Sequence, residues 1–93
     1  MMLLQLWEES DINGEIYPCG CSIHINKKNR DEYVSAYYKD VHQISDCYER
    51  IVGVETEIDL SESLFEVLLD EENIRLSEVE FNNLLNLKLI NPL

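Results

Sequence analysis

The sequence predicts an α+β fold, with one small sheet and helices packed on one of its faces. Three observations predict it: an Asn-Gly pair between two apolar runs, a later stretch in which apolar and acidic residues alternate, and several stretches with apolar residues three and four positions apart. Asn-Gly favours a tight hairpin turn, alternation indicates a half-buried strand, and the longer steps indicate amphipathic helices. The 93 residues suffice for one core, so we expect a single domain over 1–93.

The two strands of an N-terminal hairpin are expected over about 3–12 and 15–25. If Asn13-Gly14 alone forms the loop, paired residues have numbers that sum to 27. A wider loop, from Ser10 to Glu15, gives the main competing register. Pro18 has no N–H to donate to a ladder, so it implies either a bulge or an outward-facing position on a sheet edge.

A long helix is expected over about 30–48, with Asn29 as its N-cap and Glu32 completing the cap. A strand over 54–60 follows it. This order permits a parallel crossover between the flanking strands and leaves an antiparallel placement open. One apolar stripe defines the helix, and its residues are Val34, Tyr37, Tyr38, Val41, Ile44 and Tyr48.

The C-terminal third predicts two shorter helices, over about 63–71 and 78–86. Ser77 and Glu80 have the spacing of a capping box, which is the clearest local signal in the chain. A final short strand over 87–90 is compatible with the pattern. The apolar face expected for the first of these helices consists of Leu64, Phe65, Leu68 and Leu69.

The net charge is −12, and the excess of acids is uneven. Nine acids and five bases precede Glu55, whereas ten acids and two bases lie from Glu55 onward. Such a field repels nucleic-acid phosphates and anionic membranes, so direct binding to either is disfavoured. A basic protein is the natural complement, and we expect its contact surface in the later half.

The cysteines and histidines carry no pattern typical of a metal centre or an enzyme. Cys19, Cys21 and His24 are close in sequence, but one residue separates the cysteines, and a strand would point His24 to the opposite face. A metal- or redox-linked regulator built on these three residues remains the alternative from another class. We expect no cofactor, no bound metal and no catalytic residues, and therefore a binding protein that is not an enzyme.

The N-terminal apolar run has no basic flank and is short for a signal peptide, and three cysteines cannot all pair within the chain. These features favour a reduced, cytoplasmic setting. They give no oligomeric state.

Acids on the 54–60 strand and on the helix after it are the expected partner-binding surface, together with two adjacent tyrosines of the long helix. An unrelieved row of carboxylates on one strand face does not help folding, and acids at a helix C-terminus oppose its dipole. Tyrosine beside carboxylates is common in protein interfaces. The candidates are Glu55, Glu57, Asp59, Glu62, Glu66, Asp70, Glu71, Glu72, Tyr37 and Tyr38.

In its length, acidity, missing export signal and missing catalytic pattern, the chain resembles small bacterial immunity proteins of the bacteriocin and contact-dependent growth-inhibition types. The resemblance covers overall character and no motif, so it carries no residue across. It implies an antitoxin-type inhibitor that blocks the active or substrate-binding surface of a basic toxin, such as a nuclease. An inhibitor that mimics nucleic acid toward a DNA-binding protein is the alternative with the same charge logic.

Overall fold

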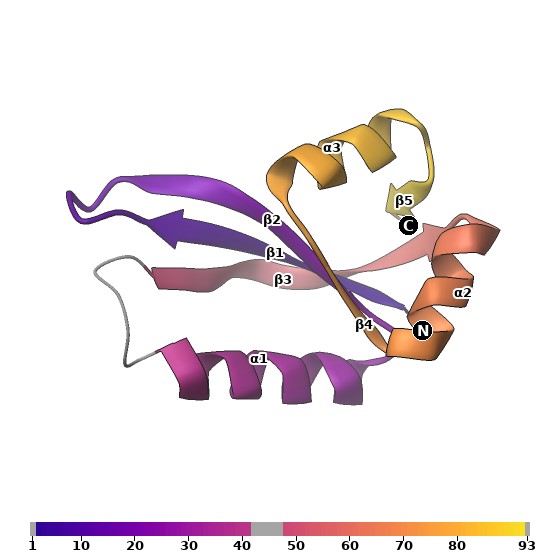
Figure 1. Ribbon diagram of the computed structural model, residues 1–93, viewed down its shortest axis with the longest axis horizontal. Coiled ribbons are helices and arrows are strands. Elements are labelled where there is room, and N and C mark those ends of the chain that lie inside the picture. The colour runs from indigo at the N-terminus through magenta and orange to yellow at the C-terminus, as the bar shows by residue number, and fades with distance from the viewer. Residues whose placement is uncertain (1, 42–47, 93) are drawn as a thin grey trace.

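The computed structural model describes residues 2–41 and 48–92, with the side chains of 39–41, 48–50 and 53–55 outside the description. It shows an α+β fold built on a five-stranded sheet of order β4-β2-β1-β3-β5 (Figure 1). In chain order the elements are β1 (Leu3–Ser10), β2 (Ile16–His24), α1 (Lys27–Val41), β3 (Tyr48–Leu60), α2 (Glu62–Glu71), β4 (Asn73–Leu76), α3 (Glu78–Asn86) and β5 (Ile90–Pro92).

All neighbouring strands of the sheet are antiparallel, with β1 in the centre. Because β2 and β3 both run antiparallel to β1, they run parallel to each other on either side of it. The chain therefore crosses over β1 through α1, which is the crossover that the order of elements permits. No helix in the described residues is long and apolar enough to cross a membrane.

In the half of the hairpin away from the turn, the numbers of paired residues sum to 27, and Leu4, for example, is opposite Ile23. The register then shifts by one residue, so that Glu8 is opposite Pro18, and the connecting loop is the wider one over 11–15. The Asp11 carboxylate explains the wider loop, since its Oδ1 accepts hydrogen bonds of 2.9 Å from two backbone N–H groups of the loop. The shift confirms a bulge beside Pro18.

The long helix begins earlier than expected and does not include Tyr48. Asn26 caps it, because Asn26 Oδ1 accepts from the backbone N–H of Asn29 at 2.8 Å. The prediction that the helix continues through 42–47 falls outside the described residues. Tyr48 begins β3, which pairs with the outer half of β1 as far as Ser10. The open edge of β1 there needs backbone partners, and this requirement outweighs the helical spacing of Tyr48.

The expectation that all helices pack on one face is wrong, because α1 covers one face of the sheet and α2 and α3 cover the other (Figure 1). On the α2 and α3 face, buried residues from all five strands and from α2 form the core cluster Leu4, Cys21, Ile23, Ile58, Leu68, Leu76 and Ile90. The strand residues between these point the other way and meet α1. The face under α1 is polar as well as apolar, and its fully buried side chains are Gln5, Trp7, Ser22 and His24.

The capping box at the start of α3 is confirmed. Ser77 Oγ accepts from the backbone N–H of Glu80 at 3.2 Å, and the Glu80 carboxylate accepts from the N–H of Ser77 at 2.9 Å. These bonds lower the pKa of Glu80. The C-terminal strand lies at Ile90–Pro92, slightly later than the expected 87–90, and pairs with the end of β3.

The bulge depends on Gly20, which has φ +104°. A Cβ at Gly20 would lie 2.0 Å from the carbonyl oxygen of Leu76 on β4, whereas one at Gly14 (φ +81°) meets nothing within 4 Å. We therefore expect Gly20→Ala to lower the free energy of unfolding by about 3 kcal/mol or more, because both backbone conformation and contact resist it. Gly14→Ala, which meets only the conformational penalty, should cost roughly 1 kcal/mol.

Urea denaturation followed by the fluorescence of Trp7, the single tryptophan, measures both values. Equal losses in the two variants would show that the close approach of β4 to the bulge contributes nothing.

Candidate functional site

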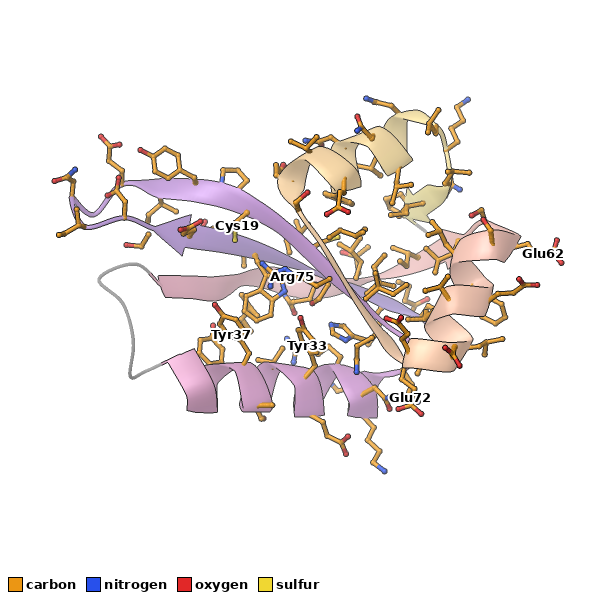
Figure 2. The ribbon with its side chains drawn as sticks, in the orientation of Figure 1. Cys19, Tyr33, Tyr37, Glu62, Glu72 and Arg75 are labelled. Atoms are coloured by element: carbon orange, nitrogen blue, oxygen red, sulfur yellow. The ribbon has the colours of Figure 1, made fainter. Side chains whose placement is uncertain are left out.

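The outer surface of α2 carries a row of exposed acidic side chains. Leu68 is fully buried against the sheet and fixes which side of the helix faces inward. Glu62, Glu66 and Asp70 follow one another at four-residue steps, so they form one ridge on the opposite, exposed side. Figure 2 shows Glu62 at the N-terminal end of this helix, directed into solvent.

Exposed apolar side chains flank this ridge. Phe65 and Leu69 lie on one side of it with 37% and 52% of their surfaces exposed, and Val67 lies on the other with 45% exposed. The expectation that Phe65 and Leu69 belong to the buried face of the helix is therefore wrong, since the core is reached through Leu64 and Leu68. The ridge and its three apolar neighbours together form what we call the α2 surface.

The acids of the α2 surface are not neutralised within the described part of the chain. The ion pairs found there join α1 residues to each other, namely Lys27 with Asp31, Lys28 with Glu32, and Arg30 with Asp31. The last turn of α2 contains no basic residue, so its acids remain at the negative end of the helix dipole, as the sequence predicts.

The two acids of β3 whose side chains are described do not join the α2 surface. Glu57 and Asp59 are exposed and alternate with Ile58, which is buried in the α2 and α3 core. Their side chains therefore lie on the other side of the sheet from α2. Glu55 is in β3, beside the register shift between β3 and β1, and its side chain lies outside the described residues.

Glu71 and Glu72 lie at the C-terminal end of α2, and Glu72 has a structural role. Glu71 is exposed in the last turn. Glu72 adopts a left-handed conformation (φ 68°) at the C-cap, and its carboxylate accepts from the Asn29 side chain of α1 at 2.8 Å. Its carbonyl oxygen also accepts from the N–H of Ile25 at 3.0 Å. Glu72 thus ties the end of α2 to the start of α1.

The tyrosines lie far from the acids, because they anchor α1 to the sheet. The Tyr37 ring packs edge-on against Trp7 with 4.8 Å between centroids, and the Tyr38 ring lies 6.2 Å from it. The Tyr38 hydroxyl accepts from the backbone N–H of Ile51 at 2.9 Å. In Figure 2, Tyr37 lies toward the C-terminal end of α1, whereas Glu62 and Glu72 lie at opposite ends of α2. The candidate residues therefore do not form one surface.

A buried chain of hydrogen bonds crosses the sheet under α1. Trp7 Nε1–H donates to Ser22 Oγ at 2.8 Å, Ser22 Oγ lies 2.8 Å from His24 Nε2, and His24 Nδ1 lies 2.7 Å from Asn73 Oδ1. Every group is satisfied when His24 is neutral and protonated on Nδ1, so that the Ser22 hydroxyl donates to Nε2. Burial lowers the pKa of His24, which favours this neutral form.

Serine, histidine and asparagine in this order are arranged like a nucleophile, a base and an orienting group. Ser22 and His24 are nevertheless completely buried, so no substrate can reach the hydroxyl. The Trp7 indole and the Tyr33 ring, 5.1 Å from the His24 ring, fill the space around them. This series of hydrogen bonds therefore has a structural role, because it holds β1, β2, β4 and α1 together.

Arginines complete this polar layer. Arg30 donates from Nε and a terminal nitrogen to Gln5 Oε1 at 3.1 and 2.6 Å, and the amide of Gln5 donates to backbone carbonyls of β1 and β3. Arg75 lies over the Trp7 ring at 4.8 Å, a cation–π contact. The sequence contains a signal for this layer, since Gln5 and Trp7 alternate with Leu4 and Leu6.

The thiols and the imidazole cannot share a metal ion. Cys21 points into the α2 and α3 core, His24 points under α1, and Cys19 is near Arg75. Within the described ranges, no group of three metal-ligating side chains converges. Cys19, Cys21 and His24 therefore form no common metal site within the described residues.

No protein-family model, curated protein or solved structure matches this chain.

The buried His24 predicts a stability that depends on pH. The unfolded chain takes up a proton near pH 6.5, whereas burial, aided by the charge of Arg30 and opposed by the Asn73 bond and Asp31, keeps the folded His24 neutral to lower pH. Stability is therefore unaffected by this group above pH 6.5 and falls below it, by up to about 1.4 kcal/mol per pH unit. Urea titrations between pH 5 and 7 of His42→Gln, which leaves His24 as the single histidine, measure the slope. A His24 imidazole that titrates at its ordinary pKa by NMR would contradict the assignment.

The cysteines should differ in reactivity. Cys21 is fully buried, which raises its pKa to about 12, whereas Cys19 is half-buried. In a Cys47→Ser background we expect a disulfide reagent to modify Cys19 in the folded protein and Cys21 only after unfolding in urea. Modification of both thiols at equal rates in the native state would contradict the burial of Cys21.

Proposed function

We propose that this protein is a small acidic binding protein that inhibits a basic protein toxin, such as a nuclease, in the manner of immunity proteins and antitoxins. It acts by covering the active or substrate-binding surface of the toxin, and it performs no catalysis itself. The observation that carries the proposal is the α2 surface, a ridge of exposed carboxylates flanked by Phe65, Val67 and Leu69.

Each part of this surface has a role in such a complex. The carboxylates attract a basic partner over a long range and raise the association rate at low salt. Phe65 and Leu69 then bury apolar area, which slows dissociation. The positions that nucleic-acid phosphates occupy on a nuclease would be filled by Glu62, Glu66 and Asp70.

A nucleic-acid mimic that inhibits a DNA-binding protein would use the same charges. Exposed apolar residues contribute less to such a mimic, because the phosphate backbone that it imitates is charged and polar. Three large apolar side chains on a ten-residue helix favour a specific protein contact over imitation of a phosphate backbone. The two functions differ in partner number: a toxin inhibitor binds one basic protein, whereas a mimic binds several unrelated DNA-binding proteins.

The test is co-expression with the tagged product of each neighbouring gene, followed by affinity capture. We expect one-to-one capture of one basic protein, with an affinity that falls steeply between low and physiological salt. In the double variant Glu66→Lys/Asp70→Lys capture should weaken by roughly a hundredfold, because two attractive charges become repulsive.

Two variants with the same change in net charge serve as controls. Glu9→Lys/Glu32→Lys reverses exposed acids on β1 and α1 and should change capture less than about fivefold. Glu57→Lys/Asp59→Lys reverses the acids on the other side of the sheet. Equal losses in all three variants would show that only total charge matters, and capture of no basic neighbour would overturn the proposal.

A further inference from the structure

A shallow groove lies beside α3, on the face of the sheet opposite α1. It has a volume of about 220 Å³, and its apolar walls are the side chains of Leu6, Pro18, Val52 and Phe81. It exists because α3 covers only part of this face, and the β1–β2 hairpin extends beyond the helix (Figure 1). Leu6 is consequently 42% exposed although it is on the same face as the buried Leu4.

A fixed carboxylate lies at the edge of the groove. Glu78 Oε2 accepts from the backbone N–H of Gly20 at 3.0 Å, and its Oε1 accepts from the Asn82 side chain at 3.3 Å. These bonds position the charge without neutralising it, and a carboxylate with one bond to each oxygen can still accept from another donor. Glu8 also lines the groove.

We infer that this groove receives and anchors one lysine or arginine side chain of the basic partner, at a position separate from the α2 surface. The inference rests on the proposed function, because that function supplies a basic protein. The methylene stem of such a side chain would lie on the apolar walls, with its cationic head at Glu78.

Size and charge together select this occupant. Pockets for small-molecule ligands usually measure about 300 to 1,000 Å³, whereas about 220 Å³ suits a single side chain. A purely apolar group would bury the Glu78 charge without compensation, and an anion would be repelled by it. A long cationic side chain satisfies both the walls and the carboxylate.

The test uses small probes and therefore does not need the partner. n-Butylguanidinium and n-butylammonium reproduce the two side chains, and n-butanol is the uncharged control. Each is titrated into the ¹⁵N-labelled full chain and followed by NMR, with the Gly20 amide as the reporter, since it donates directly to Glu78. We expect saturable shifts at Gly20, Leu6 and Phe81 with the cations and weaker binding of n-butanol.

Glu78→Gln and Glu80→Gln form a matched pair of variants. Both remove one charge from the first turn of α3. Glutamine at 78 can still accept from the Gly20 N–H through its one amide oxygen, and its NH2 group can donate to the Asn82 side-chain oxygen in place of the bond that Glu78 accepts from Asn82. Glutamine at 80 can keep the capping box. Glu78→Gln should weaken binding of the cations roughly three- to fivefold, and Glu80→Gln should leave it unchanged. Non-saturable shifts, equal binding of n-butanol or equal effects of the two variants would overturn the inference. Such a failure leaves the capture experiments on α2 untouched, so the two proposals fail separately.

Discussion

The structure depends on satisfying the polar groups buried beneath α1. Gln5, Ser22 and His24 are completely enclosed, and a buried donor or acceptor without a partner costs about 1–3 kcal/mol. Their partners come from elements distant in sequence, Arg30 on α1 and Asn73 on β4. In the described part of the chain no buried side-chain nitrogen or oxygen lacks a partner. This requirement fixes where α1 and β4 can lie on the sheet.

The placement of α1 in turn decides which surfaces are available to a partner. With α1 held on the polar face, α2 and α3 form the other layer, and α2 needs only Leu64 and Leu68 to reach the core. The remaining positions of α2 face solvent, where acids and exposed apolar residues mix. Tyr37 and Tyr38, by contrast, are used to hold α1 against Trp7. The same constraint thus separates aromatic residues of the fold from the carboxylates of the proposed interface.

Local signals in the sequence predicted much of the fold. The alternation of Glu57, Ile58 and Asp59 indicated a half-buried strand, and the spacing of Ser77 and Glu80 indicated the start of α3. Both rest on contacts within a few residues. The positions of Tyr48 and α1 depend instead on pairing with β1 and on partners for Gln5 and His24, which are distant in the chain. The candidate site was likewise only partly predictable: charge located the acids, but alternation alone could not show that Glu57 and Glu66 lie on different sides of the sheet.

β4 links the two layers through only four residues. Asn73 and Arg75 make their contacts on the α1 face of the sheet, whereas Ile74 and Leu76 pack in the core on the other face. The strand β4 is also joined to α2 at one end and to α3 at the other. Inserting or deleting one residue here would exchange the two sets, placing an arginine in the apolar core and leaving His24 without Asn73. The hairpin loop over 11–15 does not contribute side chains to both layers in this way. Variation in length among descendants of this chain should therefore accumulate at the hairpin loop and avoid the passage from α2 to α3.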